Sequence, residues 1–296
     1  MQVPTTLFYD GLAKRMSTLN ARASELQTQV ATGKKLTSPS DDAVVSDQLA
    51  EFKRRDADAK AYGANMDVAS SLLKQTDSTL RAISDQIQRA MELTVQAGND
   101  TVSTADRAVI GTELRAIVDQ LVTLGNTRDL RGQPLFGSAD GTAAVQRVPG
   151  GGFAYVATRV SDIPVGQGQT IQATESAERV FKRGDTDVLA VLTELADALE
   201  SGNGIDAVAG ALDKLTAADQ QVNTVATSVG ARAARIELNQ SLLTAENTDR
   251  EELRSALEDV DVTTAITELQ KTMTVLQATQ ASFTKLTSLS LFNYLR

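Results

Sequence analysis

The chain contains neither cysteine nor histidine among its 296 residues. Without cysteine it can form no disulfide, no thiolate zinc site and no thiol nucleophile. Without histidine it lacks the usual proton shuttle near neutral pH and the commonest metal ligand in proteins. These absences argue against an enzyme, although serine–lysine or paired-carboxylate chemistry would still be possible.

Large aromatic side chains are also scarce. Tryptophan is absent, aromatic residues make up 4% of the chain, and proline occurs only five times. A core of alanine, valine and leucine buries less apolar surface per residue than an aromatic one. This composition is typical of long helices with narrow contact seams, which gain much of their stability from partners.

The charge balance bears on the kind of partner. The net charge is −9 and the isoelectric point is about 4.7, which disfavours nucleic acid, because binding to phosphates requires a positive surface. The densest basic run, Lys53-Arg54-Arg55, is followed by Asp56 and Asp58 and is interpreted as a solvated helix face. No apolar run approaches the ~18 residues of a membrane span, and Met1–Thr6 does not resemble a secretory signal. Sequence composition alone therefore indicates a soluble cytoplasmic protein.

Apolar residues recur at alternating steps of three and four, which predicts amphipathic helices that pack on other helices. The first such helix ends at Gly33, and Ser40 is predicted to cap the next one, with Asp41 and Asp42 near its positive end. That next helix is predicted from about Asp42 to Gln96, roughly 80 Å long. A capping box at Ser103 and Asp106 begins a third helix.

Helices return after about residue 185, with a change of register at 258–261. Between them, residues 132–184 carry most of the glycine and proline clusters, and Phe153–Val160 and Thr170–Thr174 are predicted as short strands. The expected fold is mainly α: a long antiparallel helical bundle or coiled coil built from both chain ends, with a small β-rich insertion in the middle. The predicted domains are a terminal coiled coil (1–40 with 262–296), a helical rod (41–132 with 185–261) and a β-rich outer domain (133–184).

Three clusters invite a chemical interpretation. Asp41 and Asp42 form a carboxylate pair, but their place at a helix start accounts for them. Glu258, Asp259 and Asp261 contain hard-ion ligands, although a solvated helix face fits them better. Gly166-Gln167-Gly168 is similar to part of a phosphate loop, but it lacks the lysine and the following helix. We therefore predict no catalytic, cofactor or metal site.

The last residues of the chain are unusually apolar for a terminus. Few basic residues flank them, so a protein partner is favoured over a membrane surface. The apolar residues in this segment are Leu286, Leu289, Leu291, Phe292 and Leu295.

Three ordered segments resemble the flagellin and hook-associated superfamily. They are Ala31–Asp42 after the first helix, Met91–Thr101 at the end of the long helix, and Leu276–Leu286 near the C-terminus. Within the superfamily, Asn126–Asp129 leading into Gly132–Gly137, and the ending SLSLFNYL at 288–295, resemble the subunit that joins hook to filament. The resemblance covers residues 1–137 and 185–296 but not the β insertion.

The resemblance implies a structural subunit of the bacterial flagellum at the hook–filament junction, with no enzymatic activity. It also implies export of the unfolded chain through the flagellar type III apparatus without a cleaved signal, and hence an extracellular location, which replaces the cytoplasmic expectation. The implied partners are copies of itself, a neighbouring hook-associated protein, flagellin, and an export chaperone at the C-terminal region. The alternatives are a filament flagellin with a short outer domain, a carboxylate–metal hydrolase and a cytoplasmic signalling coiled coil.

The terminal segments, about 1–40 and 262–296, are expected to be weakly ordered in the monomer and to fold on assembly. Alanine and threonine interrupt the apolar face of these helices, so an isolated helix of this kind is only marginally stable in water. Together they would form the inner layer of a tube. The residues predicted for this assembly interface are Leu12, Met16, Leu19, Leu26, Val30, Leu269, Met273, Leu276, Phe283, Leu286, Leu289, Leu291 and Phe292.

Overall fold

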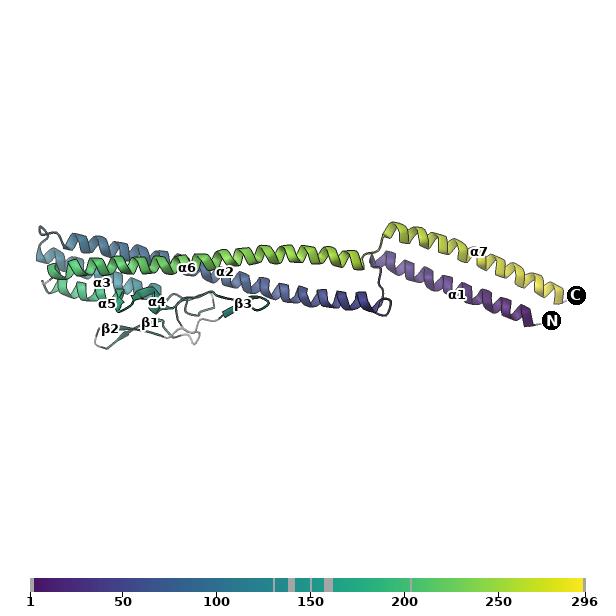
Figure 1. Cartoon of the computed structure of the whole chain (residues 1–296), viewed down its shortest axis with the longest axis horizontal. Helices are drawn as coiled ribbons and strands as arrows, with labels where there is room; N and C mark the ends of the chain where they lie inside the picture. Colours follow the sequence, from purple (N-terminus) through teal and green to yellow (C-terminus); the bar gives the residue numbers. More distant parts are fainter. Residues whose placement is uncertain are drawn as a thin grey trace. The chain divides into compact units, whose positions relative to one another are not determined.

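The computed structural model describes residues 3–129, 131–137, 142–149, 151–156, 162–202 and 204–294. The described part is mainly helical, which confirms the predicted fold class (Figure 1). Its helices are α1 (Val3–Thr32), α2 (Ala43–Ala97), α3 (Thr104–Gly125), α4 (Ala177–Phe181), α5 (Val188–Glu200), α6 (Gly204–Glu258) and α7 (Val262–Tyr294). Its strands are β1 (Val145–Val148), β2 (Gly152–Tyr155), β3 (Asp162–Gly166), β4 (Gln169–Gln172), β5 (Lys182–Arg183) and β6 (Thr186–Asp187).

Residue contacts divide the chain into two compact units. One unit, here the terminal unit, contains residues 1–57 and 245–296, and the other, the central unit, contains residues 58–244. The terminal unit holds α1 and α7 with the first residues of α2 and the last residues of α6. The central unit holds the remaining helices and all the strands.

The helix boundaries follow local sequence signals. Gly33 ends α1 with a positive φ of 70°, a backbone conformation that favours glycine. The capping box that begins α3 is confirmed, because the Asp106 backbone N–H donates to Ser103 Oγ at 3.2 Å and the Ser103 hydroxyl donates to the Asp106 carboxylate at 2.7 Å.

The predicted cap of α2 at Ser40 is wrong. The Asp42 carboxylate performs this role by accepting hydrogen bonds from the backbone N–H groups of Val44 and Val45 at 3.0 and 3.1 Å. A cap residue stands immediately before the first helical residue, and α2 begins at Ala43. Ser40 lies two residues too early, and its hydroxyl hydrogen-bonds that of Ser38 at 2.7 Å instead.

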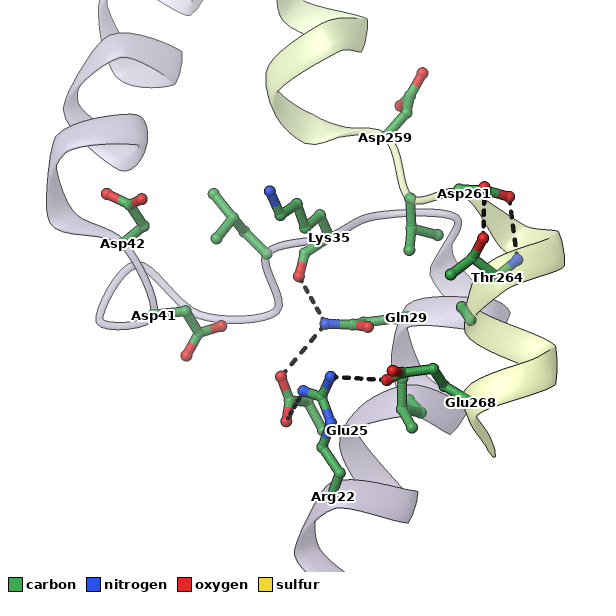
Figure 2. Close-up of a pocket in the computed structure, with 14 residues that line it drawn as sticks. Arg22, Glu25, Gln29, Lys35, Asp41, Asp42, Asp259, Asp261, Thr264 and Glu268 are labelled. Carbon is green, nitrogen blue, oxygen red and sulfur yellow. Dashed lines mark hydrogen bonds and ion pairs between the residues drawn. The ribbon is translucent and has the colours of Figure 1, made fainter. Parts of the chain in front are cut away.

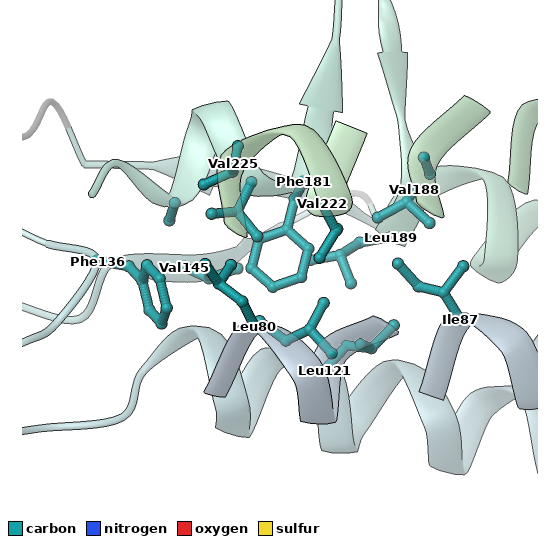
Figure 3. Packing of buried hydrophobic residues seen from close by; sticks show 14 of the residues in the cluster. Leu80, Ile87, Leu121, Phe136, Val145, Phe181, Val188, Leu189, Val222 and Val225 are labelled. Atoms are coloured by element: carbon teal, nitrogen blue, oxygen red, sulfur yellow. The ribbon is translucent and has the colours of Figure 1, made fainter. Parts of the chain in front are cut away.

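The central unit contains one continuous apolar core. It is formed by the inner faces of α2, α3, α5 and α6, and the insertion adds Phe136, Val145 and Phe181 (Figure 3). Gly125 is required where Phe181 crosses α3, because a Cβ atom there would lie 2.7 Å from the Phe181 ring. Most side chains of this core are aliphatic, as the composition predicts.

The described strands form three separate two-stranded antiparallel hairpins, β1–β2, β3–β4 and β5–β6. The two predicted strands are present with shifted boundaries. The first is β2, which ends at Tyr155, so Val156 is not part of it. Residues 157–160 of the prediction lie outside the described residues. The second is β4, which ends at Gln172, two residues earlier than predicted.

A buried ion pair joins the insertion to α6. The Glu175 side chain is 6% exposed, and its carboxylate lies 2.5 Å from the Arg232 guanidinium, itself 17% exposed, and 3.1 Å from that of Arg179. Arg232 also donates to the backbone carbonyl of Gln172 at 2.9 Å. The negative charge of Glu175 is therefore balanced by one arginine from α4 and one from α6, because a buried charge requires a partner.

We predict unequal effects for the two arginine partners. Arg232→Met leaves a buried carboxylate with one exposed partner, so the free energy of unfolding should fall by about 3 kcal/mol. Arg179→Met is the control, because Arg179 is 49% exposed and the loss should stay below about 1 kcal/mol. Urea denaturation measures both values, and equal losses would contradict the buried-pair interpretation.

Candidate assembly surface

Helices α1 and α7 pack against each other along the terminal unit, with the start of α1 beside the end of α7 (Figure 1). On α1 the inward positions repeat at steps of three and four through Leu12, Met16, Leu19, Ala23, Leu26 and Val30. At the far end the rings of Tyr9 and Phe283 meet edge to face, with centroids 5.8 Å apart. The heptad pattern of α1 is thus used in contact with the other end of the same chain.

The structure describes most of the residues predicted for assembly. Leu26 and Leu276 are buried in the α1–α7 seam, at 2% and 8% exposure, and six further residues are half-buried along the pair: Leu12, Met16, Leu19, Val30, Leu269 and Phe283. Met273 is 40% exposed. The side chains of Leu286, Leu289, Leu291 and Phe292 lie outside those the structure describes. Their role in assembly stays a prediction.

The inward face of α7 includes Leu269, Leu276 and Phe283 of the predicted interface but not Met273. It runs through Ala265, Leu269, Thr272, Leu276, Thr279 and Phe283. Two threonines and an alanine therefore occupy positions that a search for large apolar residues misses. Only the regular steps of four and three from Leu269, Leu276 and Phe283 could have indicated them.

This orientation leaves an apolar stripe on the adjoining side of α7. Val262, Ile266 and Met273 are 42%, 39% and 40% exposed. They follow one another at steps of four and seven residues, so they share one side of the helix. We call these three residues the α7 stripe. The pairing with α1 leaves this stripe uncovered, and Val275, on another side of α7, is also 45% exposed.

The two linkers that lead into the terminal helices are hydrogen-bonded to each other. The Lys35 backbone N–H donates to the Glu258 carbonyl at 2.7 Å, and the Val260 N–H donates to the Gly33 carbonyl at 3.0 Å. The Lys34 ammonium group forms an ion pair with Glu258. This joint fixes the point at which α1 and α7 begin to run together.

The carboxylates at the joint have structural partners. The Asp41 carboxylate accepts from the backbone N–H groups of Thr37 and Ser38 at 3.0 and 2.7 Å. Asp261 caps α7 by accepting from the N–H groups of Thr263 and Thr264 at 3.0 and 3.2 Å. Within the described ranges, no three or more acidic, histidine or cysteine side chains are grouped so that they could hold a metal ion. Hydrogen bonds to these loops account for the acidic clusters at both linkers.

A hollow of about 570 Å³ opens between the base of α1, the start of α7 and the 33–42 linker (Figure 2). Its apolar lining comprises Leu26, Leu36, Val260 and Ala265. Its charged lining comprises Arg22, Glu25, Lys35, Asp41, Asp42, Asp259, Asp261 and Glu268. Gln29 crosses it and donates to the Lys35 carbonyl at 2.9 Å.

Comparisons with known proteins identify the two paired ends. The bacterial flagellin N-terminal helical region matches residues 7–140, and the bacterial flagellin C-terminal helical region matches residues 212–295. The chain belongs to the flagellin family. The resemblance noted in the sequence is therefore confirmed, and the chain is a structural protein of that family that assembles with itself and with flagellar neighbours.

Two relatives match this flagellin-family chain from end to end. The flagellar hook-associated protein 3 of Escherichia coli is 28% identical and that of Salmonella typhimurium 26% identical, each over 99% of both chains. A flagellin of Bacillus subtilis is 23% identical over 90% of both chains. The solved hook-associated protein 3 of Legionella pneumophila has a TM-score of 0.62 and 14% identity, and covers 70% of this chain and 97% of its own, so it supports the fold.

The remaining alternatives belong to other classes of protein. The family match removes the carboxylate–metal hydrolase and the signalling coiled coil as interpretations of this chain. None of the described helices is long and apolar enough to cross a membrane.

The hydrogen bonds that Asp41 and Asp261 accept in the two linkers should weaken in acid. Hydrogen bonds from Ser38 and Thr37 lower the pKa of Asp41, and those from Thr264 lower the pKa of Asp261. Because both folded pKa values lie below the ordinary value of 3.8, the stabilisation is complete above that value and is lost as the pH falls through the folded pKa. An NMR titration of the Ser38 and Thr264 amides from about pH 6 to pH 2 measures this. Asp41→Asn and Asp261→Asn should each remove the local transition, and unchanged transitions in both variants would contradict the assignment.

Proposed function

We propose that this flagellin-family subunit forms the junction between hook and filament and assembles through its terminal helices. The observation that carries the proposal is the end-to-end match to two hook-associated proteins 3, with the family's N- and C-terminal helical regions both present. The C-terminal sequence SLSLFNYL and the turn at 126–137 support the same assignment within the family.

The terminal unit supplies the physical reason for assembly. In the α1–α7 pair, the described apolar side chains that reach full burial are Ala23, Leu26, Ala265 and Leu276. Such a seam offsets only part of the conformational entropy of ordering two long helices. Neighbouring subunits that cover the α7 stripe add the missing apolar contact. The terminal helices then form the inner layer of a tube, and the interface residues predicted from the sequence line it.

Filament flagellin with a short outer domain is the alternative within the family. The identity to Bacillus subtilis flagellin is lower and covers less of both chains than the match to the two hook-associated proteins, which favours the junction. The two functions differ in copy number, because a junction subunit forms a short collar and a flagellin polymerises into a long filament.

The junction assignment places the protein outside the cell, after export of the unfolded chain by the flagellar type III apparatus. The absence of cysteine suits that route, since no disulfide has to be managed. The apolar residues beyond 285 would leave the C-terminal segment prone to aggregation before assembly, and an export chaperone bound there would cover it. Flagellin and a second hook-associated protein would contact the two sides of the collar.

Electron microscopy of cells lacking this protein tests the function. We expect hooks without filaments and flagellin released into the medium, because filament subunits have no junction on which to assemble. Filaments attached to the hooks of such cells would contradict the junction function.

Complementation of the same cells tests the α7 stripe. Met273→Asp places a charge on the stripe without entering the α1–α7 seam, so incorporation should fall at least tenfold, as expected for a charge buried at an interface. Thr274→Asp is the control, because Thr274 lies on another side of the same helix and is exposed. Immunoblots of isolated flagella measure incorporation, and normal incorporation of Met273→Asp would count against the stripe.

Amide exchange of the isolated subunit tests the order of the terminal helices. We expect the amides of Leu19 and Leu276 to exchange much faster than those of Leu80 and Leu121 in the central core, because the α1–α7 seam buries few side chains. Both terminal amides should become protected in assembled flagella. Equal protection of all four amides in the monomer would overturn folding on assembly.

A further inference from the structure

The hollow at the joint carries an excess of negative charge. Six carboxylates line it (Glu25, Asp41, Asp42, Asp259, Asp261 and Glu268), against the two cations Arg22 and Lys35. Six minus two leaves a formal charge of −4. Because its apolar lining is formed by Leu26, Leu36, Val260 and Ala265, the hollow fits a long cationic side chain with an aliphatic stem.

The bonds within the hollow do not neutralise this charge. Arg22 lies 2.9 Å from Glu25 and 3.3 Å from Glu268. Asp41 and Asp261 are held by hydroxyl and backbone N–H groups, which satisfy their oxygens and leave their charge in place. Figure 2 shows Asp41 and Asp42 on one side of the hollow and Asp261 and Glu268 on the other.

The terminal unit also carries a positive segment, the run Lys53-Arg54-Arg55 on α2. All three side chains are exposed. Arg54 and Arg55 both pair with the single carboxylate of Glu51, at 2.5 and 3.0 Å. Among the described residues, Lys53 has no ion-pair partner. Within residues 51–55 the three cations share one carboxylate, so three minus one leaves a formal charge of +2. Asp56 and Asp58 follow directly, and Asp56 pairs with Arg250 and Arg254 of α6.

The run and the hollow cannot meet within one chain. Asp42 is the lining residue nearest to the run in sequence, and α2 is helical from Ala43 onward. Lys53 therefore lies about 16 Å along the helix from Asp42, at 1.5 Å per residue. A lysine side chain does not span that distance, so only a second copy can bring the two charges together.

We propose that the Lys53–Arg55 run of one copy docks on the joint hollow of a neighbouring copy. This inference rests on the proposed function, since it requires that copies assemble side by side. The contact is heterologous, because it joins two different surfaces, and its repetition builds a ring or a helix of subunits. Its small area would fix the register and orientation of neighbours rather than provide most of the affinity.

Chemical cross-linking of isolated flagella tests the contact. Because the native chain has no cysteine, a variant carrying Lys53→Cys and Glu268→Cys presents only these two thiols to a short bis-maleimide. We expect covalent dimers and a ladder of higher multimers. The control combines Lys60→Cys with Glu268→Cys, because Lys60 is exposed on the same helix about two turns away, and it should give at least tenfold fewer dimers.

Charge reversal provides a second readout that does not depend on thiols. Lys53→Glu and Glu268→Lys should each lower incorporation into flagella about fivefold, because each places like charges opposite one another. The double variant should recover most of the wild-type level, and Lys60→Glu should behave as wild type. Loss in both single variants without recovery in the double variant would overturn the pairing.

The outcomes separate this inference from the proposed function. Cross-linked multimers that contain only this chain, together with recovery in the double variant, support it. If the cysteine variant forms normal hook–filament junctions but no such multimers, the inference fails and the junction function stands. Cross-links to flagellin or to another hook-associated protein in place of a second copy would also overturn it. Filaments attached to hooks in the deletion cells would refute the junction function itself.

Discussion

Helix α7 carries more apolar surface than its neighbour α1 covers, and this excess governs how the terminal unit can behave. The α1–α7 seam takes up Leu269, Leu276 and Phe283, while the α7 stripe stays on the adjoining side. A helix with one apolar seam is satisfied by one partner, whereas a helix with a broader apolar face requires at least two. The second partner cannot be α1, so the monomer retains a surface that suits assembly.

The heptad pattern predicted the helices well because the three–four alternation reports amphipathicity directly. It does not fix which side of α7 faces α1. In α7 the apolar residues cover a wide arc, and the seam includes Thr272 and Thr279, so the largest side chains do not mark its centre. The side of α7 that faces α1 depends on the side chains that α1 presents, and these lie far away in the sequence.

The polar features were harder to predict than the apolar ones. Ser40 and Asp42 are both good capping residues, and only the exact start of α2 distinguishes them. The Glu175–Arg232 pair joins residues 57 positions apart, so no local spacing indicates it. The hollow at the joint combines side chains from α1, α7 and a linker, and its net charge is visible only once these are brought together. The sequence did indicate the charged segments separately, namely the basic run on α2 and the acidic clusters at both linkers.

The distribution of charge and apolar surface suits a subunit that must not aggregate as a free chain but must bind its neighbours in the assembly. An overall charge of −9 opposes non-specific association of free chains. Apolar attraction at the α7 stripe has no preferred direction, so by itself it would permit many arrangements of neighbours. Opposite charges at fixed positions on rigid helices penalise most of those arrangements, since a misplaced neighbour sets like charges together. Apolar contact would thus provide the attraction between subunits, and the charged joint would determine which arrangement is kept.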